Sequence, residues 1–154
     1  MAGKHASPEP SKGNTMVATA TAHWTGSLDE GSGSMSTATG LEGAFTKASR
    51  FADGAGTNPE ELIGAAHAGC FSMFLSALLS KNGTPPNAVD TTAKVSIIST
   101  DDGPVINRID LSTVVDVDLS EDEINSFAEK AKTGCPVSKA LASVETVTLK
   151  VAKA

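Results

Sequence analysis

Hydrophobic and polar residues alternate along four stretches of the chain, and a period of two predicts β-strands. A turn rich in glycine and serine near Gly31 and Gly33 divides the first stretch into two strands, and we expect Trp24 to pack at one end of the first strand. The tetrapeptide DDGP joins the second and third stretches as an antiparallel hairpin. The four stretches are residues 16–40, 88–100, 105–119 and 144–151.

The third stretch shows the alternation most clearly, because its hydrophobic residues recur at odd positions. A half-buried antiparallel strand requires this arrangement. We therefore expect one buried face made by Val105, Ile109, Leu111, Val115, Val117 and Leu119.

The longest predicted helix follows a loop at residues 47–56. Asn58 is its expected N-cap, with Pro59 at the first helical position and Glu61 at the capping-box position. The segment KNGTPP ends this helix near Ser80.

A second helix is predicted at residues 120–134, capped by Ser120 and Glu123 and stopped by Gly134. A short third helix follows Cys135 directly. The apolar stripe of the second helix consists of Ile124, Phe127, Ala128 and Ala131.

Strands and helices do not alternate as they do in proteins with parallel sheets, so the predicted fold class is α+β. We expect a single domain over residues 16–154. Residues 1–15 lack periodicity and are rich in proline, glycine, serine and lysine, which predicts a flexible N-terminal tail.

Composition and charge narrow the possible functions. The chain has 154 residues, 40% of them hydrophobic, and a formal net charge of −6. Nucleic acid is not an expected partner, because binding to phosphates depends on clustered cations that this chain lacks. Two cysteines do not form a disulfide scaffold, and no apolar run near the N-terminus indicates a secretory signal. We therefore expect a cytoplasmic protein with reduced thiols.

Residues 62–79 carry no formal charge and approach the length of a membrane span. His67, serines and glycines interrupt the stretch, and no aromatic belt or basic flank accompanies it. A helix that is apolar on all sides and rich in small residues fits the centre of a globular protein, so no membrane association is expected.

The sequence leaves several roles open for the two cysteines. Cys135 precedes Pro136 at the start of a helix, where free N–H groups and the helix dipole lower the pKa of a thiol. Cys70 lies about three turns into its helix, beyond the influence of the dipole, so a cation must be brought to it if it is to react. The alternative is that Cys70 is a small buried core residue.

Two further alternatives involve His67, which shares a helical face with Cys70. Together with Cys135 the two would supply three zinc ligands, one fewer than a structural zinc site uses. His67 would otherwise act as a base for a Cys70 nucleophile, or be a hydrogen-bonded core residue. We expect no metal and no bound organic cofactor.

The blocks SRFADGAGTNPEELIGAAHAGCFSM and KAKTGCPVSKAL resemble the two signature blocks of the osmotically inducible protein C (OsmC) family, a relative of the organic hydroperoxide resistance (Ohr) proteins. The resemblance includes AHWTG and DTTAKVS, covers nearly the whole chain from about residue 20 onward, and is closest to the OsmC branch. It implies an OsmC-like fold, in which antiparallel strands surround a central buried helix and two subunits form an intertwined homodimer with two sites at their interface.

The resemblance also implies a thiol-dependent peroxidase that reduces organic hydroperoxides, and hydrogen peroxide more weakly, in oxidative and osmotic stress defence. By position in the motif, Cys70 would be the peroxidatic thiolate and Cys135 the resolving cysteine. Arg50 would stabilise the thiolate and Glu60 would orient Arg50, with the adjacent Glu61 as the alternative partner. An external dithiol, with a dihydrolipoyl group as the candidate donor, would reopen the disulfide.

This chemistry accounts for the position of Cys70. A thiolate that attacks a peroxide becomes a sulfenic acid, which a second thiol protects from over-oxidation. Apolar surroundings raise the pKa of a thiol, so the arginine must offset that cost. The apolar side chains near Cys70 in the helix are Phe71, Met73, Phe74 and Leu75.

Helix geometry supports the dimer independently. Glu60 and Cys70 are separated by about 15 Å of helical rise, too far for one compact site. If two such helices crossed antiparallel around a two-fold axis, Glu60 of one subunit would approach Cys70 of the other. The small residues expected to permit close contact are Gly64, Ala65, Ala68 and Gly69.

A second function remains open, that of a non-catalytic stress protein which binds a small hydrophobic ligand at the dimer interface. Both cysteines would then be merely buried. The local chemistry also makes Cys135 the readier thiolate, whereas the resemblance makes Cys70 the attacker. Both statements hold together if Cys135 is the good leaving group when the disulfide is reduced.

Overall fold

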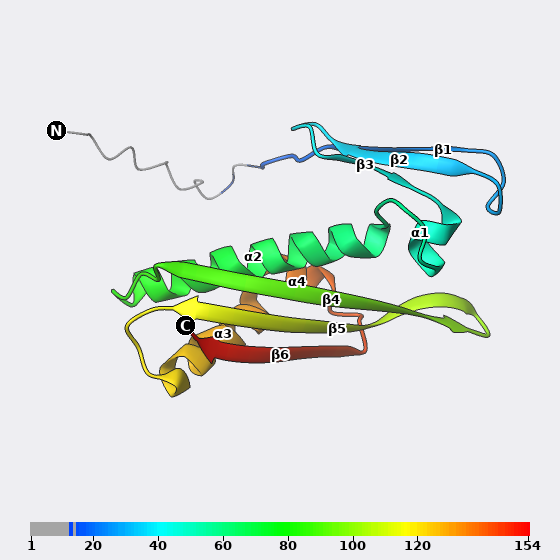
Figure 1. The fold of residues 1–154 in the computed structure, drawn as a ribbon. Helices are drawn as coiled ribbons and strands as arrows, with labels where there is room; N and C mark the ends of the chain where they lie inside the picture. Colours follow the sequence, from blue (N-terminus) through cyan, green and yellow to red (C-terminus); the bar gives the residue numbers. More distant parts are fainter. Residues whose placement is uncertain (1–12, 14) are drawn as a thin grey trace.

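A computed structural model describes residue 13 and residues 15–154, so most of the tail predicted at residues 1–15 lies outside the described residues. In this part the chain forms two three-stranded sheets and four helices (Figure 1). The elements in chain order are β1 (Ala20–Thr25), β2 (Ser32–Thr37), β3 (Glu42–Phe45), α1 (Lys47–Phe51), α2 (Pro59–Lys81), β4 (Ala88–Thr100), β5 (Gly103–Asp116), α3 (Glu121–Gly134), α4 (Pro136–Ala140) and β6 (Thr146–Lys153).

The N-terminal sheet consists of β1, β2 and β3, paired antiparallel, and lies above the start of α2, away from the second sheet, in Figure 1. The turn expected near Gly31 joins β1 to β2, but β3 was not predicted because its four residues are too few to show an alternating pattern. Trp24 packs on Phe45, with ring centroids 5.3 Å apart. A Cβ at Gly33 would lie 2.7 Å from the Phe45 ring and 2.9 Å from the Trp24 ring, so glycine lets both rings lie against the strand.

The loop predicted at residues 47–56 is helical in its first part, and the prediction was wrong for α1. Thr46 and Ser49 cap this helix reciprocally, since each side chain accepts the backbone N–H of the other. The sequence pattern missed it because a capping box normally carries Glu or Gln in place of Ser49.

Helix α2 begins where the sequence predicts. Asn58 Oδ1 accepts the backbone N–H of Glu61 at 2.8 Å, and Pro59 occupies the first turn. Glu61 does not complete a capping box, because its carboxylate accepts the Thr57 hydroxyl at 2.7 Å instead.

The second sheet combines antiparallel and parallel pairing. Strands β4 and β5 form the predicted antiparallel hairpin, whereas β6 pairs parallel to β5 after the chain has passed through α3 and α4. The lack of strand–helix alternation predicted no such crossover, and this prediction was wrong because a single crossover through α3 and α4 leaves no repeated alternation in the sequence. The class remains α+β, since every other strand pair in the described residues is antiparallel.

A bulge in β5 overturns one part of its predicted face. Asn107 is an extra residue, because Ile106 and Arg108 pair with consecutive residues of β4. A one-residue shift moves the side chains before it to the other face, so Val105 is 45% exposed instead of buried. Leu119 is partly buried against the core, and the predicted residues that are fully buried are Ile109, Leu111, Val115 and Val117.

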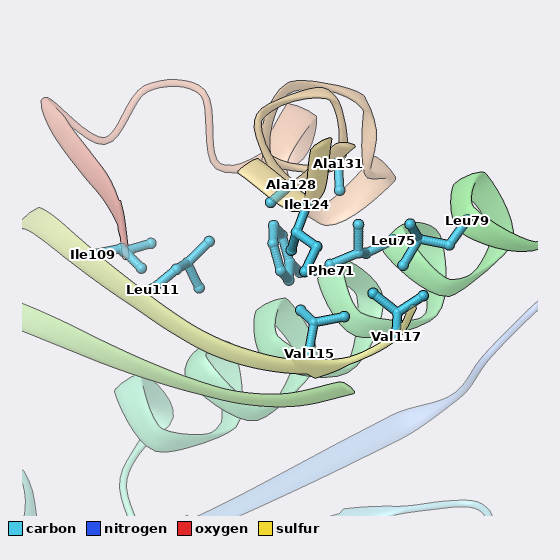
Figure 2. Close-up of a cluster of buried hydrophobic side chains, with 10 residues drawn as sticks. All are labelled: Phe71, Leu75, Leu79, Ile109, Leu111, Val115, Val117, Ile124, Ala128 and Ala131. Atoms are coloured by element: carbon cyan, nitrogen blue, oxygen red, sulfur yellow. The ribbon is translucent and has the colours of Figure 1, made fainter. Parts of the chain in front are cut away.

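The core lies between α2, the second sheet and α3 (Figure 2). Helix α2 contributes Phe71, Leu75 and Leu79, all completely buried. Helix α3 begins with the predicted capping box of Ser120 and Glu123. It contributes Ile124, Ala128 and Ala131, with Phe127 partly buried beside them.

Helix α2 is apolar on all sides but is covered on one side within the chain. Of the described helices it is the one long and apolar enough to cross a membrane, with a mean hydropathy of 1.7, and 28% of that window is buried. Ala65 and Gly69 lie on the uncovered side together with Met73, which is 73% exposed. Gly64 lies on the covered side, where a Cβ would be 3.3 Å from the Ala93 carbonyl of β4, so it does not belong to the small-residue surface expected for a crossing helix.

Candidate active site

The two cysteines lie beside each other although the sequence places them far apart. Cys70 is partly buried in the middle of α2, and Cys135 is completely buried where α3 ends and α4 begins. Both are free thiols. They influence each other's pKa, and the backbone N–H of Val137 acts on both. The arrangement therefore suits a reversible disulfide between α2 and the start of α4.

The surroundings shift the two thiols in opposite directions. Burial raises the pKa of Cys70, and the Val137 N–H offsets this only in part. Burial also acts to raise the pKa of Cys135, but the hydroxyl and backbone N–H of Ser138, with smaller contributions from Cys70 and Val137, bring it below its ordinary value. Within one chain Cys135 is the readier thiolate, as its position at a helix start predicts.

Ser138 links Cys135 to His67. Its hydroxyl lies 3.2 Å from Cys135 Sγ and 2.8 Å from His67 Nε2, and its backbone N–H donates to Cys135 Sγ at 3.3 Å. The sequence left three roles open for His67, and its burial and its bond to Ser138 agree with that of a hydrogen-bonded core residue. Ser138 itself was not predicted. Its position three residues after Cys135 at a helix start was the available signal, because an N-cap side chain normally accepts the N–H at that spacing.

Gly134 brings α3 close to α2 immediately before Cys135. A Cβ at this position would lie 2.8 Å from the Phe74 ring, so only glycine admits the aromatic side chain there. Helix α3 ends at Gly134 as predicted, but this glycine is not in the left-handed conformation of a usual C-cap. Its role is to let α3 approach α2 closely, and this contact fixes the backbone that carries Cys135.

Arg50 pairs with Glu60 and not with Glu61. The shortest contact joins Arg50 Nη2 and Glu60 Oε1 at 2.7 Å, and Nε lies 3.2 Å from both carboxylate oxygens. The Glu60 side chain is 7% exposed and that of Arg50 is 35% exposed. Asn58 strengthens the arrangement, because its Nδ2 donates to the Ser49 carbonyl and so ties α1 to the start of α2. Beside the pair is a cleft of about 330 Å³ that strand β4 also lines.

The structure thus holds two groups of candidate residues and leaves them separate within one chain. The Arg50–Glu60 pair lies at the N-terminal end of α2, and the two thiols lie near the middle of the helix. About 15 Å of helical rise separates Glu60 from Cys70. Accordingly, Arg50 is not among the groups that shift the pKa of Cys70.

The zinc alternative finds no support in the geometry. Among the described residues there is no group of three or more His, Cys, Asp and Glu side chains that would hold a metal ion. His67 Nε2 is engaged with Ser138 and therefore is not directed at the sulfur atoms as a third ligand.

This fold and the two adjoining thiols define a class of small α+β dithiol proteins. The chain belongs to the OsmC-like protein family, which matches residues 52–150. It is 45% identical over 123 residues to the peroxiredoxin OsmC of Escherichia coli, covering 78% of this chain and 86% of the relative. A more distant relative is an organic hydroperoxide resistance protein-like protein of Staphylococcus aureus, 31% identical over 93 residues, covering 58% of this chain and 64% of the relative.

The fold also resembles that of solved structures. The organic hydroperoxide resistance protein of Elizabethkingia anophelis superposes with a TM-score of 0.72 at 26% sequence identity, covering 92% of this chain and 99% of that one. These similarities confirm the predicted family and, for the single chain, the predicted OsmC-like fold.

Proposed function

We propose that this protein is a cysteine-based peroxidase that reduces organic hydroperoxides to alcohols, and hydrogen peroxide more weakly. The Cys70 thiolate attacks the peroxide, one oxygen leaves as the alcohol, and Cys70 becomes a sulfenic acid. Cys135 then condenses with it, which forms a disulfide and releases water. An external dithiol, with a dihydrolipoyl group as the candidate, reduces the disulfide and restores both thiols.

The observation that carries this proposal is the adjacent position of Cys70 and Cys135 at the junction of α2 and α4. Two buried thiols that merely fill the core would not need hydrogen bonds to the sulfur of one of them. Cys135 Sγ has such hydrogen bonds, from the hydroxyl and the backbone N–H of Ser138. The lowered pKa of Cys135 makes it a good leaving group when the disulfide is reduced. The names of the relatives, a peroxiredoxin and a hydroperoxide resistance protein-like protein, agree with this chemistry.

We further propose that the active enzyme is a homodimer in which Arg50 and Glu60 of one subunit act on Cys70 of the other. Arg50 stabilises the thiolate and Glu60 orients Arg50. Two observations support the dimer: the apolar side of α2 around Met73 is uncovered within one chain, and the ion pair lies too far from Cys70 of its own chain. An apolar groove of about 390 Å³ between the N-terminal sheet and Leu62 continues this uncovered surface.

The remaining parts of the proposal concern domain organisation and location. Residues 16–154 act as one domain. We place the protein in the cytoplasm, where thiol reductants keep both cysteines reduced between cycles.

The test follows both thiols directly. Reduced wild-type, Cys70→Ser and Cys135→Ser proteins are mixed separately with cumene hydroperoxide and hydrogen peroxide, and the products are identified by mass spectrometry over time. We expect a rapid Cys70–Cys135 disulfide in the wild type, sulfenic or over-oxidised Cys70 in Cys135→Ser, and no rapid reaction in Cys70→Ser. Slow oxidation of both thiols in the wild type would rule out the peroxidase and favour the ligand-binding protein.

A second comparison tests the arginine. Arg50→Met should slow the oxidation of Cys70 strongly, because the thiolate loses its cation. Arg108→Met is the matched control, since Arg108 is the only other arginine in the sequence and pairs with Asp110 in β5. Equal effects of the two substitutions would exclude a specific role for Arg50.

A further inference from the structure

His67 is a buried titratable group that the proposed cycle does not use. Its side chain is completely buried, and Ser138 provides its one hydrogen-bond partner among the described residues. The other ring nitrogen, Nδ1, is buried and has no partner there. A buried polar atom without a hydrogen bond costs free energy, so a histidine at this position needs an explanation beyond filling the core.

The ring belongs to a continuous hydrogen-bonded chain that ends at a thiol. His67 Nε2, Ser138 Oγ and Cys135 Sγ follow one another at 2.8 and 3.2 Å. A serine hydroxyl donates one proton and accepts others, so it transfers a proton between its two neighbours without moving. The chain joins α2 to α4 and reaches the sulfur that must lose its proton before it attacks the sulfenic acid.

No charged side chain competes for this chain of groups. The titratable groups that face it are Cys70 on α2 and Cys135 at the start of α4. Burial is the sole cause that lowers the pKa of His67, and no charged group of β4, α3 or α4 within the described residues contributes to that shift. Burial therefore favours the neutral imidazole, the form whose unprotonated ring nitrogen accepts a proton.

We propose that His67 is a positioning residue which, through Ser138, takes up the proton of Cys135 during formation of the disulfide. The inference rests on the proposed function, because it assigns a role within its second chemical step. The alternative partner considered from the sequence, Cys70, does not receive this hydrogen bond.

The step is balanced in atoms and electrons. The Cys135 S–H proton moves to Ser138 Oγ as the Ser138 proton moves to His67 Nε2. Cys135 Sγ attacks Cys70 Sγ, the S–S bond forms, and the S–O bond of the sulfenic acid breaks. The leaving hydroxide recovers the proton from the same chain and departs as water. Cys135 is oxidised, Cys70 sulfur is reduced, and no further reactant is needed.

The decisive experiment separates the two chemical steps by rapid quench and mass spectrometry in wild type and His67→Gln. Glutamine preserves a polar group toward Ser138 but takes up no proton at physiological pH. We expect sulfenic acid to form on Cys70 at the wild-type rate and disulfide closure to slow by about a hundredfold at neutral pH, the size of a lost general base. Closure in the variant should accelerate as the pH rises, whereas the wild-type rate should vary little.

Two substitutions at Ser138 provide the matched control. Ser138→Ala removes the hydroxyl and should slow closure as His67→Gln does, whereas Ser138→Thr keeps the hydroxyl and should restore it. Equal closure rates with the same pH profile in wild type and His67→Gln would overturn the proposal. A similar loss in all three variants would also overturn it, because packing alone would then explain the effect.

A last measurement stays informative if the protein proves inert toward peroxides. In a Cys70→Ser background, the ultraviolet absorbance of the Cys135 thiolate is followed against pH with and without His67→Gln. We expect the titration midpoint of Cys135 to move to higher pH in the variant. An unchanged midpoint would contradict the link from His67 to Cys135, whatever reaction the protein performs.

Discussion

Single residues decide how closely the two cysteine-bearing segments approach. Gly134 has no side chain, and the Phe74 ring occupies the space where a Cβ would lie. The contact joins α3 to α2 one residue before Cys135. The end of the helix at this glycine was predicted correctly from the sequence, but the reason for glycine is a tertiary contact that no local pattern reveals.

The substitution Gly134→Ala tests this contact. A Cβ would lie 2.8 Å from a Phe74 ring atom, and over-packing of this kind costs about 1–3 kcal/mol of unfolding free energy. Denaturant unfolding of the reduced protein measures the change. Thr133→Ala, at the exposed preceding position, should stay within about 0.5 kcal/mol, and an equal loss in both variants would contradict the packing explanation.

At the scale of elements, the start of α2 organises the Arg50–Glu60 pair. Asn58 caps α2 through Oδ1 and holds α1 through Nδ2, so one side chain fixes both elements that carry the pair. The N-cap and the helix bounds could be predicted because capping depends on neighbouring residues. Helix α1, strand β3 and the bulge at Asn107 could not, since a short element or an extra residue leaves too little periodic pattern.

The substitution Asn58→Ala should therefore destabilise more than the helix end. Loss of the cap costs about 0.5–2 kcal/mol, and the Arg50–Glu60 pair should loosen with it. Denaturant unfolding measures the first effect and the rate of peroxide oxidation of Cys70 measures the second. Asn125→Ala, which removes an exposed side-chain contact within α3, serves as the control and should change neither by much.

At the scale of the whole molecule, the candidate site and the uncovered side of α2 both concern whether a second subunit completes the site. The sequence predicted both groups of site residues from the family resemblance, and the structure brings the two thiols together and pairs Arg50 with Glu60. It does not bring these two groups together within one chain. Tertiary contacts between α2 and α4 also created the link from His67 to Ser138, which no spacing along the chain indicates.

The proposed dimer makes a prediction for Met73→Glu. A carboxylate on the uncovered apolar side of α2 should disfavour association, because it would be buried without a partner. We expect a monomer by analytical ultracentrifugation, with slow oxidation of Cys70. Leu28→Glu, at a 60% exposed position in the turn between β1 and β2, is the control and should remain associated.

The disulfide itself makes a prediction for stability. Closing a loop of about 65 residues between Cys70 and Cys135 should raise the unfolding free energy by up to about 4 kcal/mol through the loss of chain entropy in the unfolded state. Thermal unfolding of the oxidised and reduced proteins measures the difference. The Cys135→Ser protein should unfold at the same temperature under both conditions, and identical curves for wild type would contradict a bridge between α2 and α4.

The long hairpin of β4 and β5 has a consequence for the order in which the chain folds. Its strands pair from Thr100 and Gly103 at the turn to Ala88 and Asp116 at the far end, so the contacts nearest the turn are local and we expect them to form early. Helix α2 packs on β4, whereas β6 pairs with β5 only after α3 and α4 have formed the crossover that returns the chain to the sheet. We therefore expect Cys135 to reach Cys70 among the last events of folding. A newly made chain would then acquire its redox chemistry only after its architecture is complete.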